Sequence, residues 1–270
     1  MKETYLKPEK GNVFFRVSDD WDPERDTVFF MHGLTADHTM FAAQTAHFEG
    51  RYNVLAWDAP AHGRSRPFGR FSFDDSSEYM KRILDMQGVE EVFLVGQSLG
   101  GYFAQSFIKR YPGRVRGFVS LDSTPYGSGY YSKSDIWWIR QVEWMSRLYP
   151  LGRLKKAMAK QVSSTQAAFD NMTDMLAPYG KDELCRLMGL GYSAFLDDNS
   201  DITIPCPVLL ILGEKDRTGK VVRYNKEWAR RSGYPLRVIK GAAHNVNVDR
   251  PDEVNDLIAG FLRDVSDEQI

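Results

Sequence analysis

The chain has 270 residues, of which 43% are hydrophobic and 26% charged, and its formal net charge is -1. This composition excludes a disordered or fibrous protein, and the balanced charge argues against a nucleic-acid partner, which would need a clustered positive surface. No apolar run approaches the ~20 residues that a membrane span requires, and residues 1–12 are too charged for a secretory signal. We therefore expect a globular, cytoplasmic protein.

Short apolar, β-rich runs alternate with helix-like segments in the first half of the chain. Strands separated by helices of ten or more residues imply parallel strands joined by crossovers, hence an α/β sheet covered on both faces. An edge strand is predicted at residues 12–17. Further strands are predicted at 27–31, 53–57, 92–95 and 115–121, and helices at 37–48, 73–87 and 102–111.

The alternation stops between Pro125 and Asp201, where helix-like pieces follow one another without a strand. Prolines and glycines divide this stretch into three or four helices. Strands at 208–212 and 236–239 and helices at 219–231 and 251–265 then resume the pattern. We therefore expect a core formed by residues 1–125 and 201–270, with a helical insertion at 126–200.

Ser98 lies in Gly-Gln-Ser-Leu-Gly, between a predicted buried strand and a predicted helix. This is the strand-to-helix turn at which a nucleophilic serine is exposed, and side chains in place of Gly96 and Gly100 would collide with the neighbouring strand and helix. The pattern alone is common by chance, and its alternative interpretation is a glycine-rich turn with a capping serine. The order of strand, turn and helix favours the nucleophile.

A serine nucleophile needs a base, and the base needs an orienting acid. In a parallel sheet the reacting groups collect beyond the carboxyl ends of the strands. Asp216 and His244 each follow a late strand, and the order Ser98, Asp216, His244 is that of nucleophile-elbow enzymes. Asp122, after another strand, is the competing acid.

The remaining histidines have structural interpretations. His62 is expected to pack in a tight turn rather than to act as the base, and His32 to fix the shape of its loop through a backbone hydrogen bond. His38 and His47 are predicted to lie at the surface or at a boundary.

Together these motifs resemble an α/β-hydrolase with a helical cap, over nearly all of the chain outside residues 126–200. The resemblance is carried by His32-Gly33 and by residues 58–65, 96–101, 213–216 and 241–244. It implies a mostly parallel sheet with helices on both faces and a cap inserted after the sixth strand.

For the site, the same resemblance implies that Ser98 is the nucleophile, His244 the general base and acid, and Asp216 the orienting carboxylate. The backbone N–H groups of Leu34 and Leu99 would form the oxyanion hole. Gln97 stands where many members have histidine, which bears on the substrate and not on the triad.

The chain has two cysteines, Cys185 and Cys206, without metal-like spacing, and no dinucleotide or Walker-type loop. We therefore predict reduced cysteines and neither a metal nor a cofactor. No cluster of cap arginines indicates a carboxylate or phosphate ligand. Aromatic and methionine side chains of the cap are expected to line an apolar tunnel, or else to pack within the cap. They are Trp137, Trp138, Trp144, Met145, Met158, Met172 and Met175.

The predicted function is that of a serine esterase acting on a small to medium apolar carboxylic ester, as in carboxylesterases and monoacylglycerol-lipase-like enzymes. The alternative is the same triad applied to a carbon–carbon bond, a lactone or an amide, or to cofactor-free peroxidase-type chemistry. A low-turnover ligand receptor is a minor alternative. A small apolar molecule is the expected partner, and the chain is expected to be a monomer or a homodimer.

Overall fold

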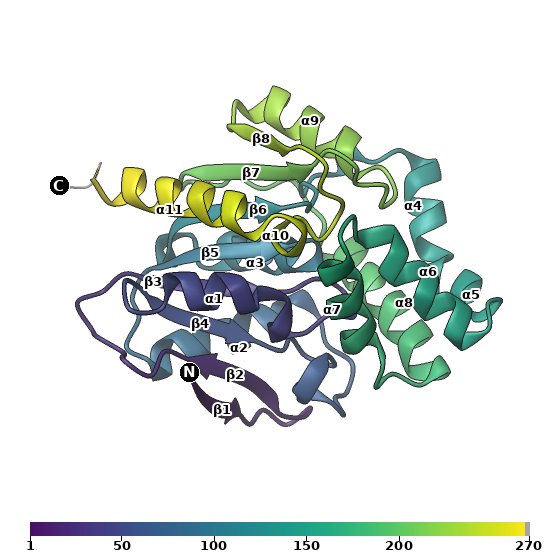
Figure 1. The fold of residues 1–270 in the computed structure, drawn as a ribbon, viewed down its shortest axis with the longest axis horizontal. Helices are drawn as coiled ribbons and strands as arrows, with labels where there is room; N and C mark the ends of the chain where they lie inside the picture. Colours follow the sequence, from purple (N-terminus) through teal and green to yellow (C-terminus); the bar gives the residue numbers. More distant parts are fainter. Residues whose placement is uncertain (268–270) are drawn as a thin grey trace.

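The computed structural model describes residues 1–267, which fold around one eight-stranded sheet (Figure 1). The strand order is β1-β2-β4-β3-β5-β6-β7-β8; β2 runs antiparallel to both of its neighbours, and all other pairs are parallel. The predicted α/β-hydrolase fold is thereby confirmed. The strands are β1 (Lys2–Leu6), β2 (Val13–Val17), β3 (Thr27–Met31), β4 (Asn53–Trp57), β5 (Val92–Gln97), β6 (Val115–Leu121), β7 (Val208–Gly213) and β8 (Leu236–Ile239).

Helices cover both faces of this sheet, with α1 and α11 on one face and α2 and α3 on the other (Figure 1). The central strands β3, β4 and β5 are buried along their whole length, as their continuous apolar sequences predict. The core helices are α1 (Ala42–Phe48), α2 (Phe73–Met86), α3 (Leu99–Arg110), α9 (Val221–Ser232), α10 (Val246–Asp249) and α11 (Pro251–Asp267).

Local sequence signals explain several helix ends. Ser72 and Asp75 form a reciprocal capping box at the start of α2, and Gly233 ends α9 in the left-handed region with φ 76°. The segment predicted as one helix from Asp37 is a 3-10 turn followed by α1, because the Asp37 side chain accepts the N–H of Thr39 and starts the turn.

The prediction that residues 12–17 form an edge strand is wrong. β2 lies between β1 and β4, and β1 is the outer strand. β1 carries Lys2, Glu3 and Thr4, and only its last residue, Leu6, is buried. Its sequence therefore lacks the apolar alternation that identifies a strand, as is common for edge strands.

The insertion after β6 forms a helical cap at the carboxyl ends of the parallel strands (Figure 1). It has five α-helices instead of the three or four predicted, because α4 and α5 are separated only at Gln141 and no proline or glycine marks the break. The cap helices are α4 (Lys133–Arg140), α5 (Val142–Arg147), α6 (Leu151–Val162), α7 (Gln166–Leu176) and α8 (Lys181–Asp198).

Two further expectations are answered in the described part of the chain. Cys185 and Cys206 are free thiols. None of the described helices combines the length and the hydropathy needed to cross a membrane.

Gly100, near the start of α3, lies directly against the end of β3. A Cβ at this position would overlap the carbonyl group of Met31. Because neither backbone can move without displacing the turn at Ser98, we expect Gly100→Ala to lower the free energy of unfolding by about 3 kcal/mol. Urea denaturation followed by circular dichroism measures this change.

Gly152→Ala in α6 is the matched control. A Cβ at Gly152 meets no neighbouring atom within 4 Å, and the glycine is part of a helix. This substitution is expected to stabilise the protein by about 0.5–1 kcal/mol, because alanine has the higher helix propensity. A Gly100→Ala variant as stable as the Gly152→Ala variant would contradict the close approach of α3 and β3.

Candidate active site

Ser98 is the residue between β5 and α3, and its backbone is in a strained conformation with φ 50° and ψ -113°. Such a conformation costs about 1–3 kcal/mol and persists only where neighbours hold it. The Ser98 N–H donates to the carbonyl oxygen of Leu121 at 2.9 Å, and the Ser98 carbonyl accepts from the Ser123 hydroxyl at 2.7 Å. The end of β6 thus holds the turn in place.

His244 and Asp216 lie in neighbouring loops after β8 and β7. The Nδ1 atom of His244 is 2.8 Å from Oδ2 of Asp216, and both residues are buried. Burial acts to raise the pKa of Asp216, but the imidazole of His244 and a hydrogen bond from the Thr218 N–H more than offset it, so the pKa of this carboxyl is lowered. Asp216 is therefore ionised at neutral pH and accepts the Nδ1 proton of His244.

Ser98 and His244 line the same cavity, whose volume is about 130 Å³. The cap closes it from one side and the core from the other. None of the lining residues is Lys, Arg, Asp or Glu, so the walls carry no fixed charge. Besides Ser98 and His244 they are Leu34, Thr35, Met40, Gln97, Met158, Gln161, Val162, Met172, Met188, Tyr192, Thr218 and Asn245.

The predicted aromatic tunnel is wrong for most of its members. Trp137, Trp138 and Trp144 are more than half exposed and do not line the cavity. Met145 and Met175 do not line it either, whereas Met158 and Met172 do. On the cap side the cavity is lined by residues of α6, α7 and α8, and by none of α4 or α5. The break in the alternation of strands and helices predicted the cap but could not predict which of its helices face Ser98.

The two residues expected to supply the oxyanion hole both lie near Ser98. Leu34 lines the cavity, and Leu99 is the first residue of α3, where a helix leaves its N–H groups without intrahelical partners. Among the hydrogen bonds of the described residues, neither the Leu34 nor the Leu99 N–H donates to another group. Both are available to a negatively charged oxygen next to Ser98.

His32 and His62 are buried structural residues. The Nδ1 atom of His32 bonds the carbonyl of Gly33 at 2.8 Å and its Nε2 accepts the N–H of Ala59 at 2.9 Å, which are the loop-fixing contacts expected of it. Burial lowers the pKa of His32, and burial together with His32 lowers the pKa of His62 to about 3. Neither ring nitrogen of His32 is free to act as the base.

His38 lies at the boundary between surface and core, one of the two positions predicted for it. Its side chain is 12% exposed, and its Nδ1 atom bonds Oδ1 of the buried Asp58 at 2.7 Å. The same carboxylate accepts the N–H of His38 and of Arg64. Asp58 therefore joins the loop after β3 to the loop after β4, and His38 belongs to that framework.

Asp122, the competing acid, lies behind the His244–Asp216 pair. One side-chain atom from each of these three residues lies within 4.8 Å of the others. Oδ1 of Asp122 accepts the N–H of Gly213 at 2.7 Å, while Oδ2 is buried without a hydrogen bond among the described residues. Burial, reinforced by the charge of Asp216, raises the pKa of Asp122 well above its usual value. The protonated form of Asp122 is therefore favoured beside the ionised Asp216.

Two positioning residues were not predicted from the sequence. The Gln97 amide donates to the His244 carbonyl at 2.8 Å and so links the end of β5 to the loop that carries His244. The Asp249 carboxylate accepts N–H groups from the cap residues Ser164 and Thr165 and from Ala243. The glutamine directly before Ser98 was noticed in the sequence, although its contact with His244 was not predicted. Nothing in the sequence relates Asp249 to the cap.

The structure also brings together arginines that are distant in the sequence. A second cavity of about 600 Å³, between the cap and the loop after β4, is lined by four of them and by Glu143 and Glu183. It shares no lining residue with the Ser98 cavity. The arginines are Arg66, Arg70, Arg140 and Arg186. Only two belong to the cap, which is why the sequence of the cap alone did not indicate a cluster.

Comparison with known proteins identifies the family of the chain. The model of the alpha/beta hydrolase family matches residues 28–257, which is most of the chain. The chain belongs to the alpha/beta hydrolase family. The hydrolase is 24% identical over 273 residues to the 2-hydroxy-6-oxononadienedioate/2-hydroxy-6-oxononatrienedioate hydrolase of Klebsiella pneumoniae, with 96% of this chain and 94% of the relative covered.

Solved structures share the fold of the hydrolase over nearly its whole length. A thermophilic esterase from Thermogutta terrifontis superposes with a TM-score of 0.79 at 19% identity, covering 98% of this chain and 99% of the esterase. The enol-lactonase from Burkholderia xenovorans LB400 superposes with a TM-score of 0.77 at 18% identity, covering 96% and 100%. The relatives thus differ in the bond that they hydrolyse, and the fold does not distinguish among these bonds.

Proposed function

We propose that Ser98, His244 and Asp216 form a catalytic triad, and that the hydrolase cleaves carboxylic esters with a small, uncharged acyl group through an acyl-enzyme. The observation that carries the proposal is the cavity of about 130 Å³ that Ser98 and His244 share, because its walls hold no charged side chain of Lys, Arg, Asp or Glu. Such a cavity suits a short acyl chain with no charge of its own.

The proposed reaction has two halves. Ser98 attacks the ester carbonyl carbon while His244 takes the serine proton, and the Leu34 and Leu99 N–H groups stabilise the negative oxygen of the tetrahedral intermediate. His244 then gives its proton to the leaving alcohol, which departs as the carbon–oxygen bond breaks. Water, deprotonated by His244, hydrolyses the acyl-enzyme and restores Ser98. Asp216 stabilises the imidazolium in both halves.

Hydrolysis of a carbon–carbon bond in a dienedioate, the reaction type suggested by the name of the Klebsiella relative, has less support. A dienedioate carries two carboxylates, and a buried carboxylate needs a cationic or hydrogen-bonding partner. No lysine or arginine lines the Ser98 cavity. Lactone hydrolysis, the activity of one structural neighbour, uses the same steps and is tested in the same assay.

A substrate panel tests the proposal. Steady-state kcat/KM is compared for p-nitrophenyl acetate, butyrate and decanoate, an enol lactone and a dienedioate. We expect the two short esters to be hydrolysed at least about tenfold faster than the decanoate, the lactone and the dienedioate. A burst without steady turnover on every substrate would indicate a low-turnover receptor, and a preference for the dienedioate would overturn the ester assignment.

Met172 of α7 is expected to limit the acyl length. It is 4% exposed and its side chain forms part of the cavity wall. Because Met172→Ala removes three side-chain heavy atoms from that wall, we expect the ratio of kcat/KM for hexanoate to kcat/KM for acetate to rise by about tenfold. The measurement uses the p-nitrophenyl ester series, with the hexanoate added, at a temperature where the variant is folded.

Met175→Ala is the matched control for this prediction. Met175 lies one turn further along α7 and is also 4% exposed, but it contacts the Asp37 N–H and not the cavity. Both substitutions are expected to destabilise the protein by about 2–5 kcal/mol, as buried methionine truncations do. Only Met172→Ala should change the chain-length ratio; an equal change in both variants would attribute the effect to loosening of the cap.

A further inference from the structure

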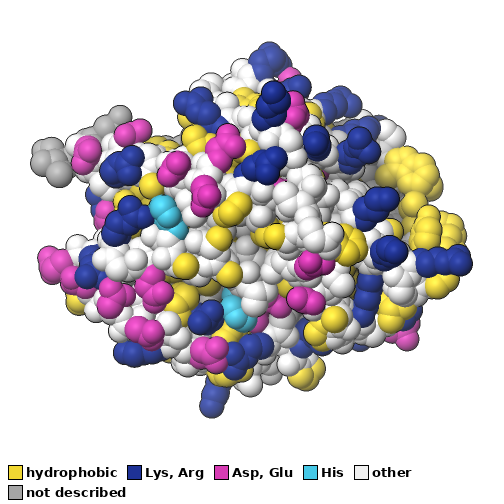
Figure 2. Space-filling model, in the orientation of Figure 1, with side chains coloured by type: hydrophobic (Ala, Val, Ile, Leu, Met, Phe, Trp, Pro, Cys, Tyr) yellow, Lys and Arg dark blue, Asp and Glu magenta, His cyan; other side chains and the backbone are white. Residues whose placement is uncertain are grey.

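The outer side of the cap exposes an unusual amount of apolar surface. Of the eight large hydrophobic side chains that are exposed in the described part of the chain, five lie on α4, α5 and the turn after α5, with exposed fractions between 55% and 66%. Figure 2 shows this patch as hydrophobic side chains at the right-hand edge, with Lys and Arg beside them. We call it the cap face. It consists of Trp137, Trp138, Trp144, Leu148 and Tyr149.

The cap face lies on a basic segment of the chain. Most of the positive charge is contributed by the following helix, α6, which has four basic residues and no acid, whereas residues 133–149 hold three basic and two acidic residues. Residues 133–162 contain seven Lys and Arg and two Asp and Glu, whereas the rest of the chain contains 28 and 34. Both acids are neutralised, since Asp135 pairs with Lys220 and Glu143 pairs with Arg147 at 3.1 Å. Six of the seven basic side chains make no ion pair within residues 1–267, and one of these, Lys155, donates to the carbonyl of Ala177. The other five are Lys133, Arg140, Arg153, Lys156 and Lys160.

The exposed apolar side chains and the unpaired basic side chains together indicate which partner could cover the cap face. In a twofold dimer the same patch would face itself, so the unpaired basic side chains of two copies would repel one another. A lipid surface with anionic headgroups attracts them instead. Protein surfaces that enter the headgroup region of a bilayer have the same composition: tryptophan, tyrosine and leucine, flanked by lysine and arginine.

We propose that the cap face docks the protein onto an anionic lipid surface. Trp137, Trp138 and Trp144 enter the headgroup region, and the unpaired lysines and arginines of α4–α6 contact lipid phosphates. The net charge of -1 does not oppose docking, because the acidic excess lies outside residues 133–162. None of the cap-face residues and none of these unpaired basic residues lines the Ser98 cavity, and the proposal does not depend on which bond the enzyme cleaves.

Co-sedimentation with vesicles tests the proposal. The purified protein is mixed with vesicles of phosphatidylcholine alone or of phosphatidylcholine with phosphatidylglycerol, at about 0.1 M and about 1 M NaCl. We expect binding to the anionic vesicles to be at least about tenfold tighter than to the neutral ones, to weaken at high salt, and to shift the tryptophan emission to shorter wavelength.

Two sets of variants separate the apolar and charged contributions. Trp137→Ala with Trp138→Ala and Trp144→Ala should weaken binding to anionic vesicles by at least about tenfold. Lys156→Glu with Lys160→Glu should weaken it by a similar factor without touching a tryptophan, since each basic residue near the surface contributes about fivefold. Lys156 and Lys160 are exposed, so their substitution by glutamate should not affect folding. This double variant therefore still tests the proposal if the triple tryptophan variant does not fold.

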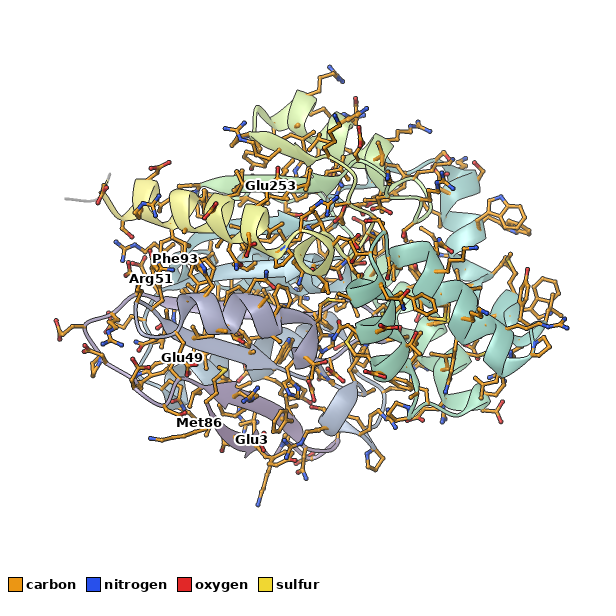
Figure 3. The ribbon with its side chains drawn as sticks, in the orientation of Figure 1. Glu3, Glu49, Arg51, Met86, Phe93 and Glu253 are labelled. Atoms are coloured by element: carbon orange, nitrogen blue, oxygen red, sulfur yellow. The ribbon has the colours of Figure 1, made fainter. Side chains whose placement is uncertain are left out.

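Met86→Ala and Arg237→Glu are the controls. Met86 is 55% exposed on α2, and Figure 3 shows it on the side of the molecule opposite the cap helices. Arg237 is an exposed basic residue of β8. Neither variant should change vesicle binding. The proposal is overturned if wild-type protein does not bind anionic vesicles or if the cap-face variants bind as tightly as the controls. It is also overturned if sedimentation velocity shows a dimer that only the tryptophan variants dissociate.

Discussion

Ser98→Ala is expected to lower kcat for p-nitrophenyl butyrate by about 10⁴- to 10⁶-fold, because it removes the atom that attacks the carbonyl carbon. The fold should be unaffected. The hydrogen bonds that hold the turn at Ser98 come from its backbone N–H and carbonyl group, and alanine retains both. A small residual rate, due to the oxyanion hole and substrate binding, is expected. Steady-state kinetics together with the thermal midpoint measure the two effects.

The matched control for this variant is Ser134→Ala in α4, an exposed serine remote from the cavity. It should retain full activity. A fluorophosphonate probe, which reacts covalently with activated serines, should label wild-type and Ser134→Ala protein equally and should not label Ser98→Ala. Substantial turnover by pure Ser98→Ala protein would refute the acyl-enzyme mechanism, whichever bond is hydrolysed.

The fold was predictable because its signals are local. Continuous apolar runs such as Thr27–Met31 occur only where both faces of a strand are covered, and a capping box or a proline marks the start of several helices. β1 was missed for the opposite reason. A solvent-facing strand needs no apolar pattern when it pairs along its whole length with β2.

The sequence predicts only those site residues whose positions follow from the order of the strands in the sheet. Parallel strands bring their carboxyl ends to one edge of the sheet, so the residues after β5, β7 and β8 converge whatever lies between them. The cap has no such constraint. Which side of α4 or α7 faces the serine depends on how five helices pack, and exposed tryptophans such as Trp144 have the same sequence signature as buried ones. The contacts of Gln97 and Asp249 likewise span loops that no periodicity relates.

Asp216→Asn is expected to reduce kcat by about 10⁴-fold. The carboxylate of Asp216 accepts the Nδ1 proton of His244 and stabilises the positive ring, whereas an amide can present its NH₂ group and favour the wrong tautomer. Asp122 is close enough to raise the question of which acid is used, since its carboxyl lies within 4.8 Å of both partners. If Asp122 were the orienting acid, Asp216→Asn would cost little and Asp122→Asn would cost about 10⁴-fold.

Asp122→Asn is expected to change kcat by less than about tenfold, because a neutral amide resembles the neutral acid and can still accept the Gly213 N–H.

The main effect of Asp122→Asn should be on the free energy of unfolding and its dependence on pH. The pKa of Asp122 is raised in the fold well above its ordinary value of 3.8 by burial and by the charge of Asp216. Between these two pKa values the unfolded chain has lost the proton and the folded chain retains it, so the stability that this group contributes is lost as pH rises. The amide has no proton to lose. The free energy of unfolding of Asp122→Asn relative to wild type should therefore increase from about pH 4 to about pH 8 in urea titrations. If the difference in the free energy of unfolding between Asp122→Asn and wild type stayed constant over that range, Asp122 would be ionised in the folded enzyme. Asp122 would then again be a candidate for the acid of the triad.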